Sequence, residues 1–214
     1  NGIELTSWKQ ALFLNLIHIN ERPGTGMFEA EMESSKFYII TGGPGTGKSA
    51  LISTLASQGF AAMPEAGRAI IQDQLAIDGP ALPWKDRLAF AELMLGWEMR
   101  SLREAAKMSG PVFFDRGVPD VAGYLRLCGL ATPDHVMEAA KLFRYQRLVF
   151  FAPPWPEIYH RDEERKQSWK EAVSTGEAMM KIYTELGYEI CALPLVSVEE
   201  RCAFIIDRLN QKKC

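Results

Sequence analysis

Cysteine pairs, long apolar runs and basic stretches are all missing from this sequence. The chain has four cysteines in 214 residues, and none stands in a C-x-x-C pair, which argues against zinc and dithiol sites. They are scattered at Cys128, Cys191, Cys202 and Cys214, a usage that predicts a reducing, cytoplasmic setting. We expect Cys128 and Cys191 to be small core residues.

The missing apolar runs and basic stretches argue against two further classes of protein, membrane-spanning proteins and nucleic-acid-binding proteins. The longest apolar stretch, residues 11–19, is interrupted by Asn15 and His18 and is far shorter than the ~20 residues that a membrane-spanning helix needs. The net charge is only -3 and both signs are mixed along the chain, so a dedicated nucleic-acid surface is not expected. We therefore expect partners other than a membrane or a nucleic acid, and the pattern predicts no particular oligomeric state.

What is present is the composition of an ordinary globular domain. Hydrophobic residues make up 47% of the chain and charged residues 24%.

The N-terminal segment differs in pattern from the rest of the chain. A capping-box pair, Ser7 with Gln10, precedes apolar residues at helical spacing, and a breaker-rich segment follows at residues 20–26. Residues 1–35 are therefore predicted to be a helical extension and linker, and residues 36–214 to be the main domain.

After the linker, strand patterns alternate with helical patterns. The expected strands cover residues 37–40, 59–63, 111–115, 147–151 and 188–193. The expected helices include 84–107 and a long polar helix from 158 to about 186. Trp84 is expected to pack in the core, and the alternative is that it closes an acceptor pocket. Ser197 with Glu200 is a capping box that begins the final helix. Such alternation predicts a parallel sheet that is covered by helices on both faces.

One motif carries specific chemistry. The segment directly after the first expected strand matches G-x-x-x-x-G-K-S in full, and a helix is expected to begin within it. The glycines let backbone N–H groups turn inward around phosphate oxygens, and the helix N-terminus favours the same anion. Lys48 would place a cation on the outer phosphates, and Ser49 would coordinate magnesium. The expected nucleotide-binding residues of this P-loop are Gly42, Gly43, Pro44, Gly45, Thr46, Gly47, Lys48 and Ser49.

Asp115 ends the third expected strand, where an acidic residue can reach the metal of a P-loop site. We expect Ser49 and Asp115 to hold Mg²⁺ and ATP to be the nucleotide, because the N-K-x-D guanine signature occurs nowhere in the chain. Arg116 follows Asp115, whereas motor ATPases commonly have Glu there. A cation suits charge neutralisation during phosphoryl transfer, and the alternative is that Arg116 pairs with a nearby carboxylate.

The P-loop and Asp115 also predict the strand order. One strand lies between them in the sequence, and short right-handed crossovers place the Asp115 strand beside the strand that precedes the P-loop. The expected fold class is α/β: a P-loop NTPase three-layer sandwich with a five-stranded parallel sheet of order 2-3-1-4-5, the kinase-like arrangement.

Four more charged positions are candidates for the chemistry. Glu65 follows the second strand at the carboxyl edge of the sheet, where it could accept an acceptor's hydroxyl proton or hold a metal-bound water. The alternative is that Glu65 is an acidic residue in the first helical turn that stabilises the helix dipole. Arg68, one turn further on, could contact the same anionic ligand. Arg161 and Arg165 are four residues apart and could form a lid, at about 153–176, over the phosphates. The alternative is a solvated charged face.

Several segments together resemble a bacterial family of predicted ATPases that is grouped by name with the AAA domains. They are the P-loop and residues 64–68, 114–120, 159–165, 186–189, 193–194 and 197–201. The motif order is also similar to that of nicotinamide riboside kinase and deoxynucleoside kinases. That resemblance implies a catalytic base at Glu65 and an acidic-Arg pair at Asp115 and Arg116. It also implies an arginine lid at Arg161 and Arg165.

Three functions are consistent with these patterns. The leading interpretation is an ATP-dependent kinase for an unidentified small-molecule acceptor, with ATP and Mg²⁺ as cofactors, and Glu65 and the arginine lid favour it. The second is an ATPase or nucleotide-dependent switch that acts on a protein partner, and Arg116 in place of Glu argues against a motor. The third is a nucleotide sensor without turnover.

Overall fold

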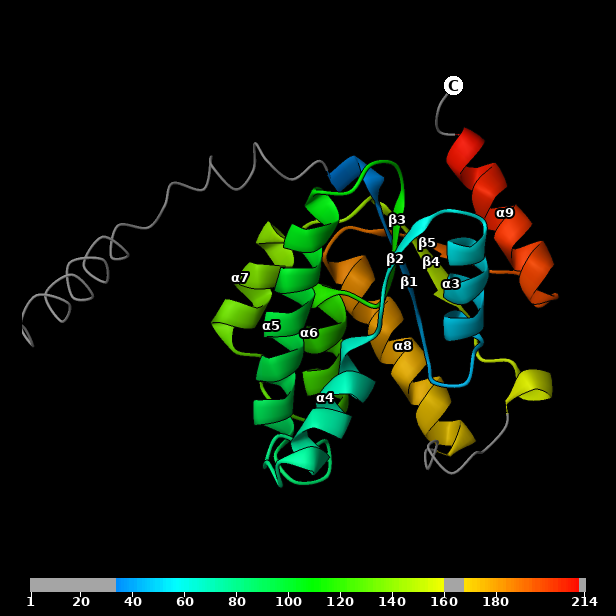
Figure 1. Cartoon of the computed structure of the whole chain (residues 1–214). Coiled ribbons are helices and arrows are strands. Elements are labelled where there is room, and N and C mark those ends of the chain that lie inside the picture. The colour runs from blue at the N-terminus through cyan, green and yellow to red at the C-terminus, as the bar shows by residue number, and fades with distance from the viewer. Residues whose placement is uncertain (1–33, 160–167, 212–214) are drawn as a thin grey trace, which may run out of the picture. The chain divides into compact units, whose positions relative to one another are not determined.

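A parallel sheet between two layers of helices forms the domain (Figure 1). The computed structural model describes residues 34–159 and 168–211. The strands are β1 (Phe37–Gly42), β2 (Ala61–Met63), β3 (Val112–Asp115), β4 (Leu148–Ala152) and β5 (Glu189–Ala192). All neighbouring pairs are parallel and the order is β2-β3-β1-β4-β5. The predicted fold class and strand order are confirmed.

The helices divide between the two faces of the sheet. They are α3 (Lys48–Ser57), α4 (Ala66–Ala76), α5 (Arg87–Ala106), α6 (Val118–Leu127), α7 (Asp134–Leu142), α8 (Trp169–Glu185) and α9 (Val198–Gln211), with short 3-10 turns η1 (Ser34–Lys36) and η2 (Pro156–Ile158). Helices α3 and α9 pack together on one face, and α5, α6 and α8 cover the other (Figure 1).

The central strand β1 is buried along its whole length because both of its faces are covered. Tyr38 and Ile40 belong to the core that includes Ile205 of α9. Phe37 points to the opposite face, where its ring packs edge-on against Phe114 at 5.7 Å. A strand buried on both faces has a continuous apolar sequence, and this is why the strand was recognisable without alternation.

The predicted helix from 158 to about 186 is wrong at its start. Tyr159 and Ser168 both have extended backbone, and α8 begins only at Trp169. Ser168 and Glu171 form a capping box, in which the Glu171 N–H donates to the Ser168 hydroxyl at 3.3 Å and the Glu171 carboxylate accepts from the Ser168 N–H. The same signal correctly marked the start of α9.

Two predictions about core residues are also wrong. The Asp86 carboxylate accepts from the Ala89 N–H at 2.9 Å and caps α5, so the helix begins after Trp84. Trp84 lies in the preceding loop and is 65% exposed. Cys128 is only partly buried, whereas Cys191 is partly buried and packs against the core that includes Ile205.

The start of the described chain is tied to the helical layer. Lys36 Nζ donates to the carbonyl of Ala106 at 3.3 Å and to that of Met108 at 2.7 Å, which joins η1 to the end of α5. The predicted extension up to residue 33 lies outside the described residues. No helix in the described part of the chain is long and apolar enough to cross a bilayer.

Two helical glycines should respond oppositely to alanine. A Cβ at Gly96 in α5 would have no atom within 4 Å, whereas one at Gly123 in α6 would lie 2.8 Å from Met179 Sδ. Gly96→Ala should raise the free energy of unfolding by about 0.5–1 kcal/mol, because the unfolded chain loses freedom without a clash. Gly123→Ala should lower it by about 1 kcal/mol through overpacking. Denaturant unfolding of both variants checks this, and shifts of equal sign would contradict it.

Candidate active site

The P-loop runs from the end of β1 into α3 and encloses the Lys48 side chain. Lys48 Nζ donates to the carbonyls of Gly42 and Gly43 at 3.2 and 2.7 Å, and the Thr46 hydroxyl donates to the Gly43 carbonyl at 2.9 Å. Burial and, after it, the charge of Arg116 lower the pKa of Lys48 to about 8. The ammonium group therefore lies inside the loop, at the position where a P-loop holds phosphates.

Packing as well as turning requires glycine in this loop. A Cβ at Gly42 would lie 2.3 Å from the carbonyl oxygen of Ala152 in β4, and one at Gly43 would lie 2.2 Å from that of Ala172 in α8. Gly47 has φ 81°, a left-handed conformation, at the N-terminus of α3. The sequence predicted the turn, whereas the close contacts with β4 and α8 became visible only in the structure.

The structure brings Ser49 and Asp115 together, as the sequence predicted. Strands β1 and β3 are neighbours with Ile40 in register with Asp115, and Ser49 Oγ lies 3.4 Å from Asp115 Oδ2. Asp115 is buried, and among the described residues its Oδ1 has no hydrogen-bond partner. Burial raises the pKa of this carboxyl above its ordinary value.

These two side chains fit a magnesium ion. Mg²⁺ prefers oxygen ligands and is usually held by one or two carboxylates, with phosphate and water oxygens completing its shell. The unpartnered Asp115 Oδ1 and the Ser49 hydroxyl are oxygen ligands of this kind. Within residues 34–159 and 168–211 no group of three or more His, Cys, Asp or Glu side chains could hold a metal, so a metal here would depend on the nucleotide for its other ligands.

Arg116 has a backbone conformation that is unfavourable for a residue with a side chain. Its φ is 76°, and its own contacts compensate for that strain. The backbone N–H donates to the Ile40 carbonyl at 3.1 Å. The side chain donates from Nε to Glu65 at 3.1 Å and from Nη1 to Asp120 at 3.2 Å. The carboxylate pairing that the sequence offered as an alternative for Arg116 is therefore present.

Asp120, at the start of α6, is a buried residue that the sequence analysis did not single out. Its carboxylate accepts four hydrogen bonds: from Arg116, from the Gly117 N–H at 3.0 Å, and from the hydroxyls of Thr41 and Tyr183, both at 2.6 Å. Four is about the full capacity of a carboxylate. The available signal was an acid three residues after a helix-preceding glycine, which is the spacing of a capping box.

Glu65 lies at the N-terminal cap of α4, close to the cations Arg116 and Lys48. Burial alone raises its pKa, but Arg116 and Lys48 outweigh burial and hold the pKa of Glu65 below its ordinary value. The carboxylate is therefore ionised at neutral pH and can accept a hydrogen bond from a hydroxyl group. Arg68 adds to the positive charge around it.

A second carboxyl that the sequence analysis missed is Glu98 of α5. It is 4% exposed. Burial and, after it, the charge of Asp120 raise the pKa of Glu98 well above its ordinary value. A signal was available, because Glu98 interrupts an apolar stripe at spacing i+4 that contains Phe90, Met94 and Leu102.

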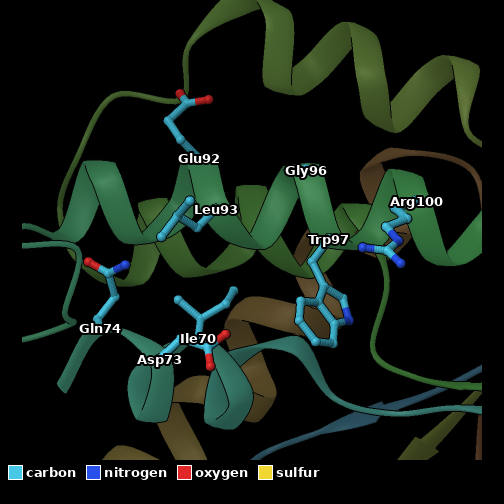
Figure 2. A pocket seen from close by; sticks show the side chains of 8 residues that line it. All are labelled: Ile70, Asp73, Gln74, Glu92, Leu93, Gly96, Trp97 and Arg100. Carbon is cyan, nitrogen blue, oxygen red and sulfur yellow. The ribbon is translucent and has the colours of Figure 1, made fainter. Parts of the chain in front are cut away.

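A pocket of about 370 Å³ lies between α4 and α5 (Figure 2). It is lined by Ile70, Asp73, Gln74, Glu92, Leu93, Gly96, Trp97 and Arg100. In Figure 2 the Trp97 ring extends from α5 toward the α4 side chains. None of the predicted site residues lines this pocket. Helix α4, which begins just after Glu65, therefore borders the pocket with one face.

The two predicted lid arginines lie in a segment between η2 and α8. Arg161 and Arg165 fall within residues 160–167, outside the described part of the chain, so the lid stays a prediction. The rings of Tyr159 and Trp169, which flank that segment, meet edge-on at 5.2 Å.

Sheet order, P-loop and carboxylates together define a P-loop nucleotide-binding protein with a kinase-like fold. The chain belongs to the AAA domain family, which it matches over residues 37–201. No curated protein sequence matches the chain.

Three solved structures show how the fold is shared. The NadR protein in complex with NR is 19% identical, with a TM-score of 0.61 over 95% of this chain and 58% of that chain. Deoxyadenosine kinase from M. mycoides, with dCMP and dCDP, is 15% identical, with a TM-score of 0.61 over 82% of this chain and 99% of that chain. Thymidylate kinase from Ehrlichia chaffeensis is 12% identical, with a TM-score of 0.54 over 82% and 98%. The chain thus spans little more than half of NadR, and the likeness shows the fold.

Lys48 should make nucleotide binding pH dependent. Phosphate anions favour the charged ammonium, so a lysine with a pKa of about 8 takes up a proton when ADP binds at alkaline pH. Affinity for ADP should fall as the pH rises above about 8, whereas a lysine of ordinary pKa would show no fall until about pH 10. Calorimetry at about pH 8.5 in two buffers of different ionisation enthalpy measures the proton uptake. Lys48→Met is the control, and an equal uptake in that variant would contradict the assignment.

Glu98 should make stability pH dependent. Folding favours its protonated form, so its contribution is complete at acidic pH and is lost as the pH rises through the raised pKa. Glu98→Gln mimics the protonated form. Its melting temperature should be close to the wild-type value at about pH 5 and above it at about pH 8. Glu138→Gln, at an exposed site, is the control, and an equal pH trend in both variants would contradict this account.

Proposed function

We propose that the protein is an ATP-dependent phosphotransferase that moves the terminal phosphate of ATP to a hydroxyl group of a small-molecule acceptor. The observation that carries the proposal is the Glu65–Arg116 ion pair, 3.1 Å long, at the carboxyl edge of the sheet beside the P-loop. Ligands bind at this edge in open parallel sheets. The similarity in fold to three solved proteins, two of them named as kinases, supports the same class.

The proposed step moves one phosphoryl group. The acceptor oxygen forms a bond to the terminal phosphorus, the bond from that phosphorus to the bridging oxygen breaks, and the electron pair leaves with ADP. The hydroxyl proton goes to Glu65. Because the transition state of phosphoryl transfer is loose, the proton leaves late, and a carboxylate of lowered pKa is sufficient to orient the hydroxyl group.

The other residues of the site neutralise charge. Lys48 and the P-loop amides bind the phosphates, and Arg116 lies between Glu65 and Asp120 as a fixed cation. Mg²⁺ held by Ser49 and Asp115 would add charge neutralisation at the phosphates when it is bound. We also propose that Arg161 and Arg165 act as cations of a lid over the phosphates, because their spacing of four residues would place them on one helix face.

Glu65→Gln tests the proposed role of the carboxylate. An acceptor is first identified by screening nucleosides, vitamins and sugars with ATP for ADP release above the background without acceptor. With that acceptor, the variant should lose about 10²- to 10³-fold in acceptor-dependent ADP release, because the proton acceptor is gone. The affinity for ATP should change less than about twofold, because the P-loop supplies it. Asp73→Asn, an exposed acid on the same helix, is the matched control and should behave as wild type.

Two results would contradict the proposal in different ways. An equal loss of acceptor-dependent release and background hydrolysis would mean that Glu65 positions water or metal, which supports an ATPase or switch that acts on a protein partner. An unchanged rate in both assays would reduce Glu65 to a carboxylate that stabilises the start of α4.

A further inference from the structure

Arg201, in the first turn of α9, is a buried cation. It is 1% exposed and forms no ion pair with a described residue. A buried guanidinium stays charged, and burying a charge is costly unless it is paired. Its Nη2 is buried and has no hydrogen-bond partner among residues 34–159 and 168–211. Among the described residues this positive charge therefore has no carboxylate counter-ion.

Three segments that are distant in sequence meet at this guanidinium. Nη1 donates to the carbonyl of Thr46 in the P-loop at 2.9 Å, and Nε donates to the carbonyl of Pro194 after β5 at 3.0 Å. The guanidinium lies over the ring of Trp155, 4.8 Å from its centroid. The cation is thus adjacent to the loop that binds an anion.

The bond to Thr46 fixes the orientation of one peptide unit. The Thr46 carbonyl and the Gly47 N–H belong to the same planar trans peptide and point in opposite directions. When the carbonyl points outward to Arg201, the Gly47 N–H points inward. Gly47 has φ 81°, and a glycine-flanked peptide rotates at little steric cost, so this orientation needs an external contact. A charge-assisted bond to the carbonyl also polarises the peptide and strengthens the N–H as a donor.

We propose that Arg201 is a positioning residue for the nucleotide phosphates: it holds the Thr46–Gly47 peptide so that the Gly47 N–H donates to phosphate, and its positive charge favours the anion. The inference rests on the proposed nucleotide site and assigns a residue of α9 to it. A purely structural Arg201 would support folding alone, whereas a positioning residue also sets phosphate affinity.

Inorganic tripolyphosphate is the decisive probe, because it contacts the P-loop without a base or ribose. In the full chain, Arg201→Met should bind both ATP and tripolyphosphate roughly tenfold more weakly, the effect of one charge-assisted hydrogen bond. Arg201→Gln, which removes the charge but stays polar, should lose affinity for both in the same way. Arg208→Met is the matched control, because Arg208 lies on the same helix over a ring, that of Phe204, and is exposed. It should bind as wild type.

A second readout separates positioning from folding. In protein labelled with ¹⁵N-glycine, tripolyphosphate should shift the Gly47 amide proton downfield, and the shift should be smaller in the Arg201 variants. A variant with a native circular dichroism spectrum is folded. If such a variant keeps the wild-type affinity and shows the same Gly47 shift with tripolyphosphate as the wild type, the inference is overturned and the proposed function is left intact. Failure of the wild-type protein to bind ATP or tripolyphosphate would overturn the proposed function itself.

Discussion

The contacts of Asp120 are the constraint on which the rest of the site depends. This buried carboxylate joins β1, the turn after β3 and α8, because its four donors come from those segments. It also holds Arg116 in a backbone conformation with φ 76° that the side chain would otherwise disfavour. Without the hydrogen bond to Asp120, Arg116 would lose the contact that directs its side chain toward Glu65.

The direction of Arg116 explains how charges from separate elements come together at one edge of the sheet. Glu65, Asp115 and Asp120 supply three carboxyl groups, and Lys48 and Arg116 supply two cations that lie close to them. The cations hold the pKa of Glu65 down, whereas burial raises that of Asp115. This difference agrees with the roles that we propose for them: Glu65 accepts a hydrogen bond from a hydroxyl group, and Asp115 binds a cation.

The sequence predicted features that local pattern controls and missed those that depend on distant packing. The P-loop, the strand order and the pairing of Ser49 with Asp115 were accessible, because a motif, an apolar run and the handedness of crossovers determine them. Arg201 was missed because its contacts come from segments far away in the chain. Asp120 and Glu98 each had a local signal, but that signal does not show that the carboxyl is buried, because distant helices decide its burial. The start of α8 was missed although its capping box was present, because the charge run before it also fitted a helix.

The fate of the terminal phosphate of ATP tests the central claim most directly. Phosphorus NMR of the wild-type protein with ATP, Mg²⁺ and the acceptor from the screen distinguishes a phosphate ester from inorganic phosphate. A kinase site predicts that the resonance lost from ATP reappears as a phosphate monoester in an amount equal to the ADP formed. If all of the released phosphate is inorganic while the acceptor is unchanged, the account of Glu65 and Arg116 as an acceptor-phosphorylating site is contradicted.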